Sequence, residues 1–340
     1  MEFNSEKKDN SFSVGDIYLG RIRKTMPGLN AAFVDVGHDK DAFLHYLDLG
    51  PQYLSLMKFT KEVSAGGHRD GLLNNFSLEK DLEKGGKVSG ILAANQWIPV
   101  QIAKEPISTK GPRITCDLSM AGRFVVMVPF TNMVSVSQKI KSSEERNRLK
   151  RIVASIKPQN FGIIIRTVAE GKKTAEIDKD IRDLLSKWAS FTELLRAAKP
   201  PQKLLGEMNR TSTILRDMLN AGFSSIVVND QMVFDEVRSY IRSIAPEQEE
   251  IVKFHKGKVP VFEHFGIDKQ IKSVFGKTVN MQNGAYLIVE HTEALHVIDV
   301  NSGGRSKAGS DQENNALQVN MMAAKEIARQ LRLRDMGGII

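Results

Sequence analysis

Two polar side chains near the end of a predicted strand are the first candidates for chemistry in this sequence. Residues 295–300 form a short apolar run with β-forming residues, and Asp299, Val300 and Asn301 stand at its end. Because side chains alternate along a strand, Asp299 and Asn301 project from one face and Val300 from the other. A carboxylate and an amide oxygen on one face are hard donors of the kind that bind Mg²⁺. The alternative is an ordinary strand end at which both residues cap a turn, and the spacing alone favours it.

The sequence around this pair predicts a β-hairpin followed by a long helix. Residues 286–290 and 295–300 are short apolar runs with a brief polar break, a spacing typical of paired strands. Residues 302–310 are small, glycine-rich and basic, so that this segment can come close to a phosphate backbone. The helix is expected to begin near Ser310, with Glu313 completing a capping box. Its predicted core-facing row is Leu317, Met321, Ala324, Ala328 and Leu331.

A second polar pair ends an apolar strand in the middle of the chain. Residues 161–167 are strongly apolar until Arg166 and Thr167, and a turn follows at Gly171. A forked guanidinium donor beside a hydroxyl suits a terminal phosphate. Taken alone, however, the sequence favours an ordinary surface pair at this position.

Two phenylalanines lie on the polar faces of predicted strands near the start. In residues 31–36, Phe33 shares a face with Asp35 and alternates with a wholly apolar face. In residues 41–45, Phe43 lies on the face of Asp41 and His45. Exposed aromatic rings can stack on nucleic-acid bases, at about 1–3 kcal/mol per base. The alternative is that both rings are core residues covered by a following segment, and the pattern leaves the two interpretations open.

The strands that carry these phenylalanines belong to a predicted small barrel. The five short runs, separated by turn residues, are residues 16–23, 31–36, 42–45, 97–102 and 113–117. This number and length of strands is typical of an OB-fold. Residues 47–93 contain the pairs Gly66-Gly67 and Gly85-Gly86, which predict an inserted loop or a partly ordered excursion.

Helices and strands alternate through the rest of the chain. Residues 175–188 place a core stripe on one helix face, with Ile177, Ile181, Leu184, Leu185 and Trp188. Alternation of this kind indicates layered α/β structure. Three acids stand at a predicted helix start, where negative charge is favourable, and receive no catalytic role here: Asp230, Asp235 and Glu236.

Composition favours a polyanionic partner and a reducing compartment. The 340 residues carry 48 Lys and Arg against 40 Asp and Glu, a net charge of +8, and 41% are hydrophobic. That length predicts two to four domains, and the basic balance favours nucleic acid, although many basic proteins bind nothing specific. Cys116 is the single cysteine, which excludes an intrachain disulfide or a cysteine-cluster zinc site and fits the cytoplasm. We expect no membrane segment, because no apolar run approaches the roughly 18 residues required, and residues 1–13 lack a signal-peptide core.

Residues 297–306 (VIDVNSGGRS) and 314–340 (NNALQVNMMAAKEIARQLRLRDMGGII) resemble the catalytic segment of the ribonuclease E/G family. The resemblance implies that Asp299 binds Mg²⁺ and that Asn301 supports the site. It also implies a second metal-binding Asp on the strand after the LRDMGG residues. The sequence ends at Ile340, inside that expected strand, so we expect this chain to lack the second carboxylate and to cleave poorly.

Residues 15–45 resemble the S1-type RNA-binding barrel of the same family. The resemblance implies that Phe33 and Phe43 grip single-stranded RNA and that Lys110 meets a phosphate. The alternative for Lys110 is a solvated loop lysine, the commonest fate of this residue type. Residues 121–129 and 163–172 resemble the family's 5′-sensor, which implies a 5′-monophosphate pocket made by Arg166, Thr167, Gly122 and Val126.

The resemblance implies an α+β multidomain chain. Its expected parts are an S1-like OB barrel (14–118, with insertion 47–93), a 5′-sensor-like region (119–212), an RNase H-like region (213–276) and the start of a DNase I-like catalytic domain (277–340). The family's first strands and its cysteine-containing zinc-link, which is used in homo-oligomers, have no counterpart here. We therefore expect a chain truncated at both ends.

Two functions from different classes follow from these features. The first is a Mg²⁺-dependent endoribonuclease that cuts single-stranded RNA in rRNA processing and mRNA decay and favours 5′-monophosphorylated ends. The second is a non-catalytic module that binds single-stranded RNA and is indifferent to chelator and to Asp299. A weaker third hypothesis is a fragment that does not fold stably, because a half-built catalytic sheet would expose its edge.

Overall fold

The computed structural model describes residues 12–68, 71–107, 110–208, 210–220, 222–303 and 312–340. The chain divides into two compact units, Lys8–Phe223 and Ser224–Ile340. Each unit has a hydrophobic core and combines helices with sheets, so the predicted α+β class is confirmed. In the described residues no helix is both long and apolar enough to cross a membrane.

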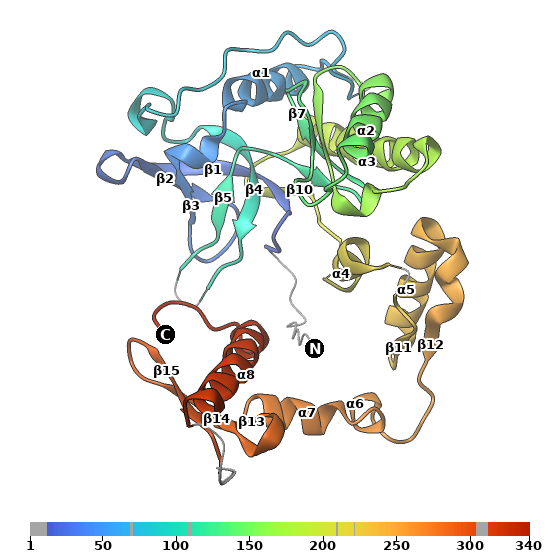
Figure 1. Ribbon diagram of the computed structural model, residues 1–340. Helices are drawn as coiled ribbons and strands as arrows, with labels where there is room; N and C mark the ends of the chain where they lie inside the picture. The colour runs from blue at the N-terminus through green and yellow to red at the C-terminus, as the bar shows by residue number, and fades with distance from the viewer. Residues whose placement is uncertain (1–11, 69–70, 108–109, 209, 221, 304–311) are drawn as a thin grey trace. The chain divides into compact units, whose positions relative to one another are not determined.

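Five strands close a β-barrel in the first unit (Figure 1). They are β1 (Ile17–Met26), β2 (Ala31–Asp35), β3 (Ala42–His45), β4 (Trp97–Lys104) and β5 (Arg113–Thr115). The order around the barrel is β1-β2-β3-β5-β4, and β4 pairs with β1 to close it. Within this barrel β3 and β5 run parallel and the other pairs are antiparallel. The predicted OB-type barrel is thus consistent with the structure. A further strand, β10 (Gln202–Leu205), pairs with β1.

The segment between β3 and β4 is irregular around its glycine pairs, as they predicted, but it also contains a helix that they did not predict. It begins with a 3-10 turn (Tyr46–Leu49) and continues into α1 (Tyr53–Ser64), which buries Leu56, Phe59 and Val63. The apolar spacing of these residues is helical, and Gly66-Gly67 follows the end of the helix, whereas Gly85-Gly86 lies in the irregular stretch further along. A second 3-10 turn (Val88–Gly90) precedes β4.

This segment shares a core with the sheet region that follows the barrel. The Phe59 ring lies 5.5 Å from that of Phe130 and 5.3 Å from that of Trp188. The Trp188 indole N–H donates to the Gly71 carbonyl at 2.7 Å, and Asn160 donates to the Leu73 carbonyl at 2.8 Å. Barrel and sheet therefore belong to one packed unit.

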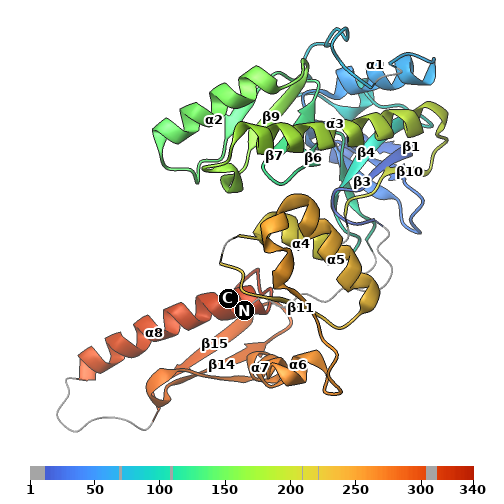
Figure 2. The ribbon, with the colours of Figure 1, turned by 90° about the vertical axis from the view of Figure 1, so that its right-hand side faces the viewer.

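A four-stranded sheet and two long helices complete most of the first unit. The sheet order is β6-β7-β9-β8, formed by β6 (Met120–Ala121), β7 (Val125–Pro129), β8 (Val134–Val136) and β9 (Phe161–Ile165). Two helices, α2 (Ser143–Ile156) and α3 (Thr174–Ala197), pack against it (Figure 2). The predicted stripe on α3 is confirmed by its buried residues Ile177, Ile181, Leu184 and Trp188, while Leu185 is half-buried. A short helix, α4 (Arg210–Met218), ends the unit.

The second unit contains a small parallel pair and a separate hairpin sheet. The pair is β11 (Ile226–Val228) and β12 (Val252–Phe254), connected through α5 (Gln231–Ile244) and a 3-10 turn (Pro246–Ile251). Two short helices follow, α6 (Val261–His264) and α7 (Ile267–Val274).

The three-stranded antiparallel sheet has the order β13-β14-β15, formed by β13 (Thr278–Asn280), β14 (Tyr286–His291) and β15 (His296–Asn301), with a 3-10 turn (Gln282–Gly284) between the first two. The RNase H-like and DNase I-like character of these parts remains a prediction.

The last helix, α8 (Gln312–Leu333), packs on this sheet with a different face from the predicted one. Val319 and Ala323 are buried, and Ala323 packs with Leu287 and Val289. In contrast, Leu317 is 61% and Met321 is 68% exposed, so the predicted row is wrong. The helix carries two apolar rows, and spacing alone does not say which row meets the sheet. The predicted start at Ser310 lies outside the described residues.

Candidate functional site

The two predicted stacking residues face each other across neighbouring strands of the barrel. Phe33 on β2 is directly opposite Phe43 on β3, with ring centroids 5.9 Å apart and planes at 69°. Their strand neighbours Ala32, Val34 and Leu44 are wholly buried inside the barrel. Both phenylalanines are half-buried and line an open hollow, and no lining residue comes from residues 47–93. The alternative that this segment covers them as core residues is therefore wrong.

The hollow beside these rings has a volume of about 640 Å³ and a basic lining. Its lining residues are Lys24, Phe33, Lys40, Asp41, Phe43, Lys110, Gly111 and Arg113. The Lys24 ammonium lies 5.1 Å from the centre of the Phe33 ring, within cation–π range. Asp48 accepts two hydrogen bonds from Arg113, at 2.9 and 3.0 Å, and these raise the pKa of Arg113. The three lysines are exposed, so the hollow combines two aromatic rings with an excess of positive charge.

Lys110 reaches this hollow because the next residue is glycine. A Cβ atom at Gly111 would collide with the carbonyl oxygen of Asp41, so only glycine lets the loop lie this close to the end of β3. The structure thus brings the three residues of the predicted strand-holding set together. Aromatic faces next to ammonium groups can bind bases and phosphates of one nucleic-acid strand.

Arg166 stands where β9 ends, and its guanidinium is held by two acceptors. Nη1 donates to the Gly122 carbonyl at 2.8 Å and to Asp217 Oδ1 at 2.8 Å. The side chain is 23% exposed. Thr167 starts a 3-10 turn (Thr167–Ala169), and its exposed hydroxyl lies 3.2 Å from the hydroxyl of Ser137. A guanidinium and two hydroxyls therefore gather at this end of the sheet.

Gly122 lies in the turn between β6 and β7, and Val126 lies on β7, which pairs with β9. Asp180 on α3 accepts the backbone N–H groups of residues 123, 124 and 125 at 3.0, 2.8 and 3.0 Å. A Cβ at Gly122 would come within 2.5 Å of the Asp180 carboxylate, which explains the glycine. Burial raises the pKa of Asp180, and the three N–H donors oppose that effect. Val126 is half-buried and pairs with Ile164, two residues before Arg166, so it flanks the Arg166 end of the sheet.

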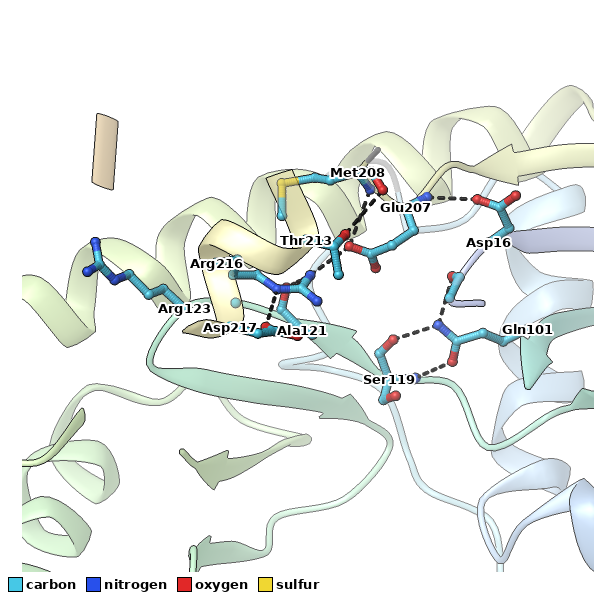
Figure 3. Close-up of polar contacts among 12 residues, drawn as sticks. Asp16, Gln101, Ser119, Ala121, Arg123, Glu207, Met208, Thr213, Arg216 and Asp217 are labelled. Carbon is cyan, nitrogen blue, oxygen red and sulfur yellow. Dashed lines mark hydrogen bonds and ion pairs between the residues drawn. The ribbon is translucent and has the colours of Figure 1, made fainter. Parts of the chain in front are cut away.

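Asp217, on α4, joins Arg166 to a row of charged side chains in which Arg216 is buried. Figure 3 shows this row from Asp217 to Asp16. Arg216 donates from Nε to Asp217 Oδ1 at 2.9 Å and from Nη1 to Glu207 Oε1 at 2.6 Å. Burial would raise the pKa of Asp217, but the hydrogen bonds from Arg216 and Arg166 outweigh it and lower that pKa. Asp217 is therefore a carboxylate at neutral pH.

Asp299 and Asn301 lie on one face of β15, as the alternation predicted. Asn301 Nδ2 donates to Asp299 Oδ2 at 2.9 Å. Val300 and Ile298 pair with Leu287 and Val289, whose face packs on α8, so the polar pair projects from the opposite face. Asp299 is exposed and Asn301 half-buried. Most of the basic segment predicted beside them, residues 304–310, lies outside the described residues.

This polar pair supplies only part of a metal coordination sphere. Asp299 Oδ1 and Asn301 Oδ1 are not used in their mutual hydrogen bond, so both oxygens are available to a hard cation. Nowhere in the described ranges do three or more His, Cys, Asp or Glu side chains gather as a metal site. One or two protein oxygens, completed by water and substrate phosphates, are a common arrangement for Mg²⁺.

Comparison with known proteins shows which family the chain belongs to. The model of the ribonuclease E/G family matches residues 119–340. The chain belongs to the ribonuclease E/G family. It is 35% identical over 331 residues to a protein named ribonuclease E from a Nostoc species, which covers 96% of this chain and 44% of that protein. It is 33% identical over 340 residues to ribonuclease G of Escherichia coli and 34% identical over 339 residues to ribonuclease G of Haemophilus influenzae, in each case covering 100% of this chain and 65% of the relative.

The chain spans less than two thirds of the length of these relatives, so their whole activity comes to it only as a proposal. Sequence reasoning missed Asp217 and Ser137, which stand 51 and 30 positions from their partners Arg166 and Thr167. No local pattern announces such contacts, because they form only when α4 and β8 meet the end of β9.

Proposed function

We propose that this chain carries the RNA-holding and metal-binding parts of an endoribonuclease that cuts single-stranded RNA. Family membership supports the reaction class. The observation that carries the proposal is the Asp299–Asn301 pair, whose two free oxygens share the exposed face of a strand in a chain of this family. A place in rRNA processing and mRNA decay is part of this proposal and rests on the family alone.

The proposed metal is Mg²⁺, held by the carboxylate of Asp299 with Asn301 beside it. When bound there, Mg²⁺ would polarise the scissile phosphate and lower the pKa of a water molecule. The Asn301 amide donates to Asp299 Oδ2 and so limits rotation of the carboxylate, which leaves Oδ1 directed for coordination. An asparagine in place of Asp299 would remove the negative charge that a divalent cation requires.

The hollow at Phe33, Phe43 and Lys110 is the proposed grip on the single strand. Two half-buried rings allow bases to stack without sequence preference, because every base presents a π-face. Lys24, Lys40 and Lys110 can meet neighbouring phosphates as point charges. Binding of this kind weakens steeply with added salt.

The end of β9 is the proposed pocket for a 5′-monophosphate. Arg166 and the Thr167 hydroxyl would bind the phosphate oxygens, while Gly122 anchors the guanidinium through its carbonyl and Val126 flanks it. A free 5′-phosphate differs from an internal phosphodiester in its extra charge and its open geometry. A forked guanidinium recognises both features.

A non-catalytic RNA-binding module is the second candidate function. One observation favours it: in the part of the chain that the structure describes, Asp299 belongs to no group of three or more His, Cys, Asp or Glu side chains that could hold a metal ion. One carboxylate with several waters binds Mg²⁺ weakly. The hollow and the pocket would serve such a module equally well.

Cleavage of a short fluorescent single-stranded RNA separates the two candidates. We would compare 5′-monophosphate and 5′-hydroxyl forms, with Mg²⁺ and with chelator, for the natural chain and for Asp299→Asn. The endoribonuclease hypothesis predicts Mg²⁺-dependent cleavage that is faster on the monophosphate and lost in the variant. Binding without any cleavage, unchanged by chelator, would favour the module.

A further inference from the structure

The guanidinium of Arg166 has one edge in use and one edge open. An arginine carries five N–H donors, two on each terminal nitrogen and one on Nε. Both donors of Nη1 are used, by the Gly122 carbonyl and by Asp217 Oδ1. Among the described residues, Nε and Nη2 have no hydrogen-bond partner, and together they form the two-pronged edge that matches phosphate oxygens.

Asp217 can hold that orientation because it is itself fixed. Its Oδ1 also accepts from Nε of Arg216, whose side chain is only 7% exposed. Arg216 in turn donates from Nη1 to Glu207 and to the Ala121 carbonyl, at 2.6 and 3.1 Å (Figure 3). The Glu207 backbone N–H donates to the buried Asp16, which precedes β1. The row thus runs from the end of β9 to the barrel.

From Arg166 to Glu207 the charges of this row alternate, so the two guanidinium groups are offset by two carboxylates. Arg166 and Arg216 are balanced by Asp217 and Glu207. The negative charge of Asp217 is shared by two guanidinium groups at 2.8 and 2.9 Å. A phosphate at the open edge of Arg166 therefore meets donors, with the carboxylate bound on the other side of the same group.

We propose that Asp217 is a positioning residue for 5′-end recognition: it holds Nη1 of Arg166 so that the Nε–Nη2 edge faces a terminal phosphate monoester. This inference rests on the proposed 5′-phosphate pocket and extends it. Asp217 touches neither RNA nor the reacting atoms. Its contribution is to lower the conformational cost of placing the guanidinium, as expected for a preorganised binding group.

The test compares affinities for one short single-stranded RNA with a 5′-monophosphate or with a 5′-hydroxyl, without Mg²⁺ so that no cleavage occurs. The variants are Asp217→Ala, which removes the acceptor, and Asp217→Asn, which keeps an amide oxygen for Arg166. We expect the preference for the monophosphate to fall about tenfold in Asp217→Ala and less in Asp217→Asn, since a charge-assisted hydrogen bond is lost or weakened. Affinity for the 5′-hydroxyl RNA should stay within about twofold, because the hollow holds that strand.

Asp178→Ala is the matched control. Asp178 also pairs with an arginine, Arg182, at 2.7 Å, but that arginine is four residues along the same helix, α3, and is not part of the row. If Asp217→Ala keeps the full preference, or if both RNA forms weaken equally, Asp217 has no positioning role. Should Asp217→Ala fail to fold, the near-isosteric Asp217→Asn decides by the same ratio. If the natural chain shows no preference for the monophosphate, the proposed pocket itself is wrong and this inference falls with it, whereas a preference that survives both variants overturns only the inference.

Discussion

Arg166 in the first unit and Asp299 in the second are the charged residues on which 5′-end binding and cleavage are proposed to depend, and their surroundings differ. Arg166 is 23% exposed and tied to a backbone carbonyl and to Asp217, which a second, buried arginine holds. Asp299 is exposed, and among the described residues its side chain accepts a hydrogen bond from Asn301. The proposed phosphate-binding residue is held in place by other charged groups of the protein, whereas the proposed metal-binding residue is exposed.

This difference indicates that the side chain of Arg166 is ordered by contacts within the protein, whereas that of Asp299 would be ordered by a bound ligand. A guanidinium fixed by a carboxylate loses little conformational entropy when a phosphate binds, so the proposed 5′-phosphate pocket would need no cofactor. An exposed carboxylate such as that of Asp299, with an amide oxygen of Asn301 beside it, becomes ordered only when a cation and its other ligands bind. We therefore expect RNA binding and RNA cleavage to respond to different perturbations.

Removal of metal is expected to have the largest effect. Chelation should lower the cleavage rate by a factor of about 100 or more, since a metal supplies several kcal/mol of charge stabilisation. Affinity of the hollow for a 5′-hydroxyl single strand should change little. Rates and dissociation constants measured with chelator, and with chelator already saturated by Mg²⁺, would check this. A parallel loss of affinity would mean that the metal also supports RNA binding by the first unit, and the proposed separation of binding from cleavage would be wrong.

Truncation of the aromatic pair comes next. Phe33→Ala and Phe43→Ala should each weaken single-stranded RNA binding by about 1–3 kcal/mol, because each removes one stacking face. Fluorescence anisotropy at fixed salt measures the effect. Phe262→Ala is the control, since Phe262 is 44% exposed in the second unit and outside the hollow. Equal losses in control and test variants would argue against the hollow as the grip.

Loss of Lys110 should produce a smaller and salt-dependent change. Lys110→Ala removes one phosphate contact, which lowers the slope of log affinity against log salt by about 0.7 for a single strand. A titration between low and physiological salt gives that slope. Lys61, exposed near the end of α1, provides a control lysine outside the hollow. An unchanged slope in Lys110→Ala would indicate that Lys110 is a solvated loop lysine that contacts no phosphate.

The smallest expected effect is on the pH dependence of stability, through Glu145, which binds the turn that follows Thr167. Hydrogen bonds from Arg148 and from the Gly171 N–H hold the pKa of Glu145 at about 2, below its ordinary value of 4.5. Because the folded state lowers this pKa, the stabilisation is complete above about pH 4.5 and is lost as the pH falls toward 2. Denaturant unfolding at pH 6, 4 and 3 should show a shallower loss in Glu145→Gln than in the natural chain. The same loss in both would mean that other carboxylates dominate.

Local patterns in the sequence were sufficient where a single apolar row exists. The row on α3 predicted its buried face, and strand alternation placed Phe33 and Phe43 on the outside of the barrel and Asp299 with Asn301 on one face of β15. On α8 two rows compete, and only contact with Leu287 and Val289 selects Ala323 over Met321. In residues 47–93 the glycine pairs drew attention away from a helix whose Phe59 packs against Phe130 and Trp188, far along the chain.

The candidate site shows the same limit. Residue types and family motifs indicated Arg166, Thr167, Asp299 and Lys110, but the partners that fix them come from distant elements. Asp217 contacts Arg166 only because α4 returns to the β6–β7 turn, and Gly111 matters only because Asp41 lies against its loop. Tertiary contacts of this kind have no period or motif that a sequence can display.

The most direct test of this account measures affinity and cleavage together for Asp299→Asn and Phe33→Ala on one 5′-monophosphorylated RNA in Mg²⁺. We predict that Asp299→Asn loses cleavage while its dissociation constant stays within about twofold of the natural chain, because binding resides in the hollow and the 5′-pocket. Phe33→Ala should raise the dissociation constant while the cleavage rate at saturating protein is retained. If Asp299→Asn weakens binding as much as Phe33→Ala does, or cleaves as fast as the natural chain, the division of binding and chemistry between the two units is wrong.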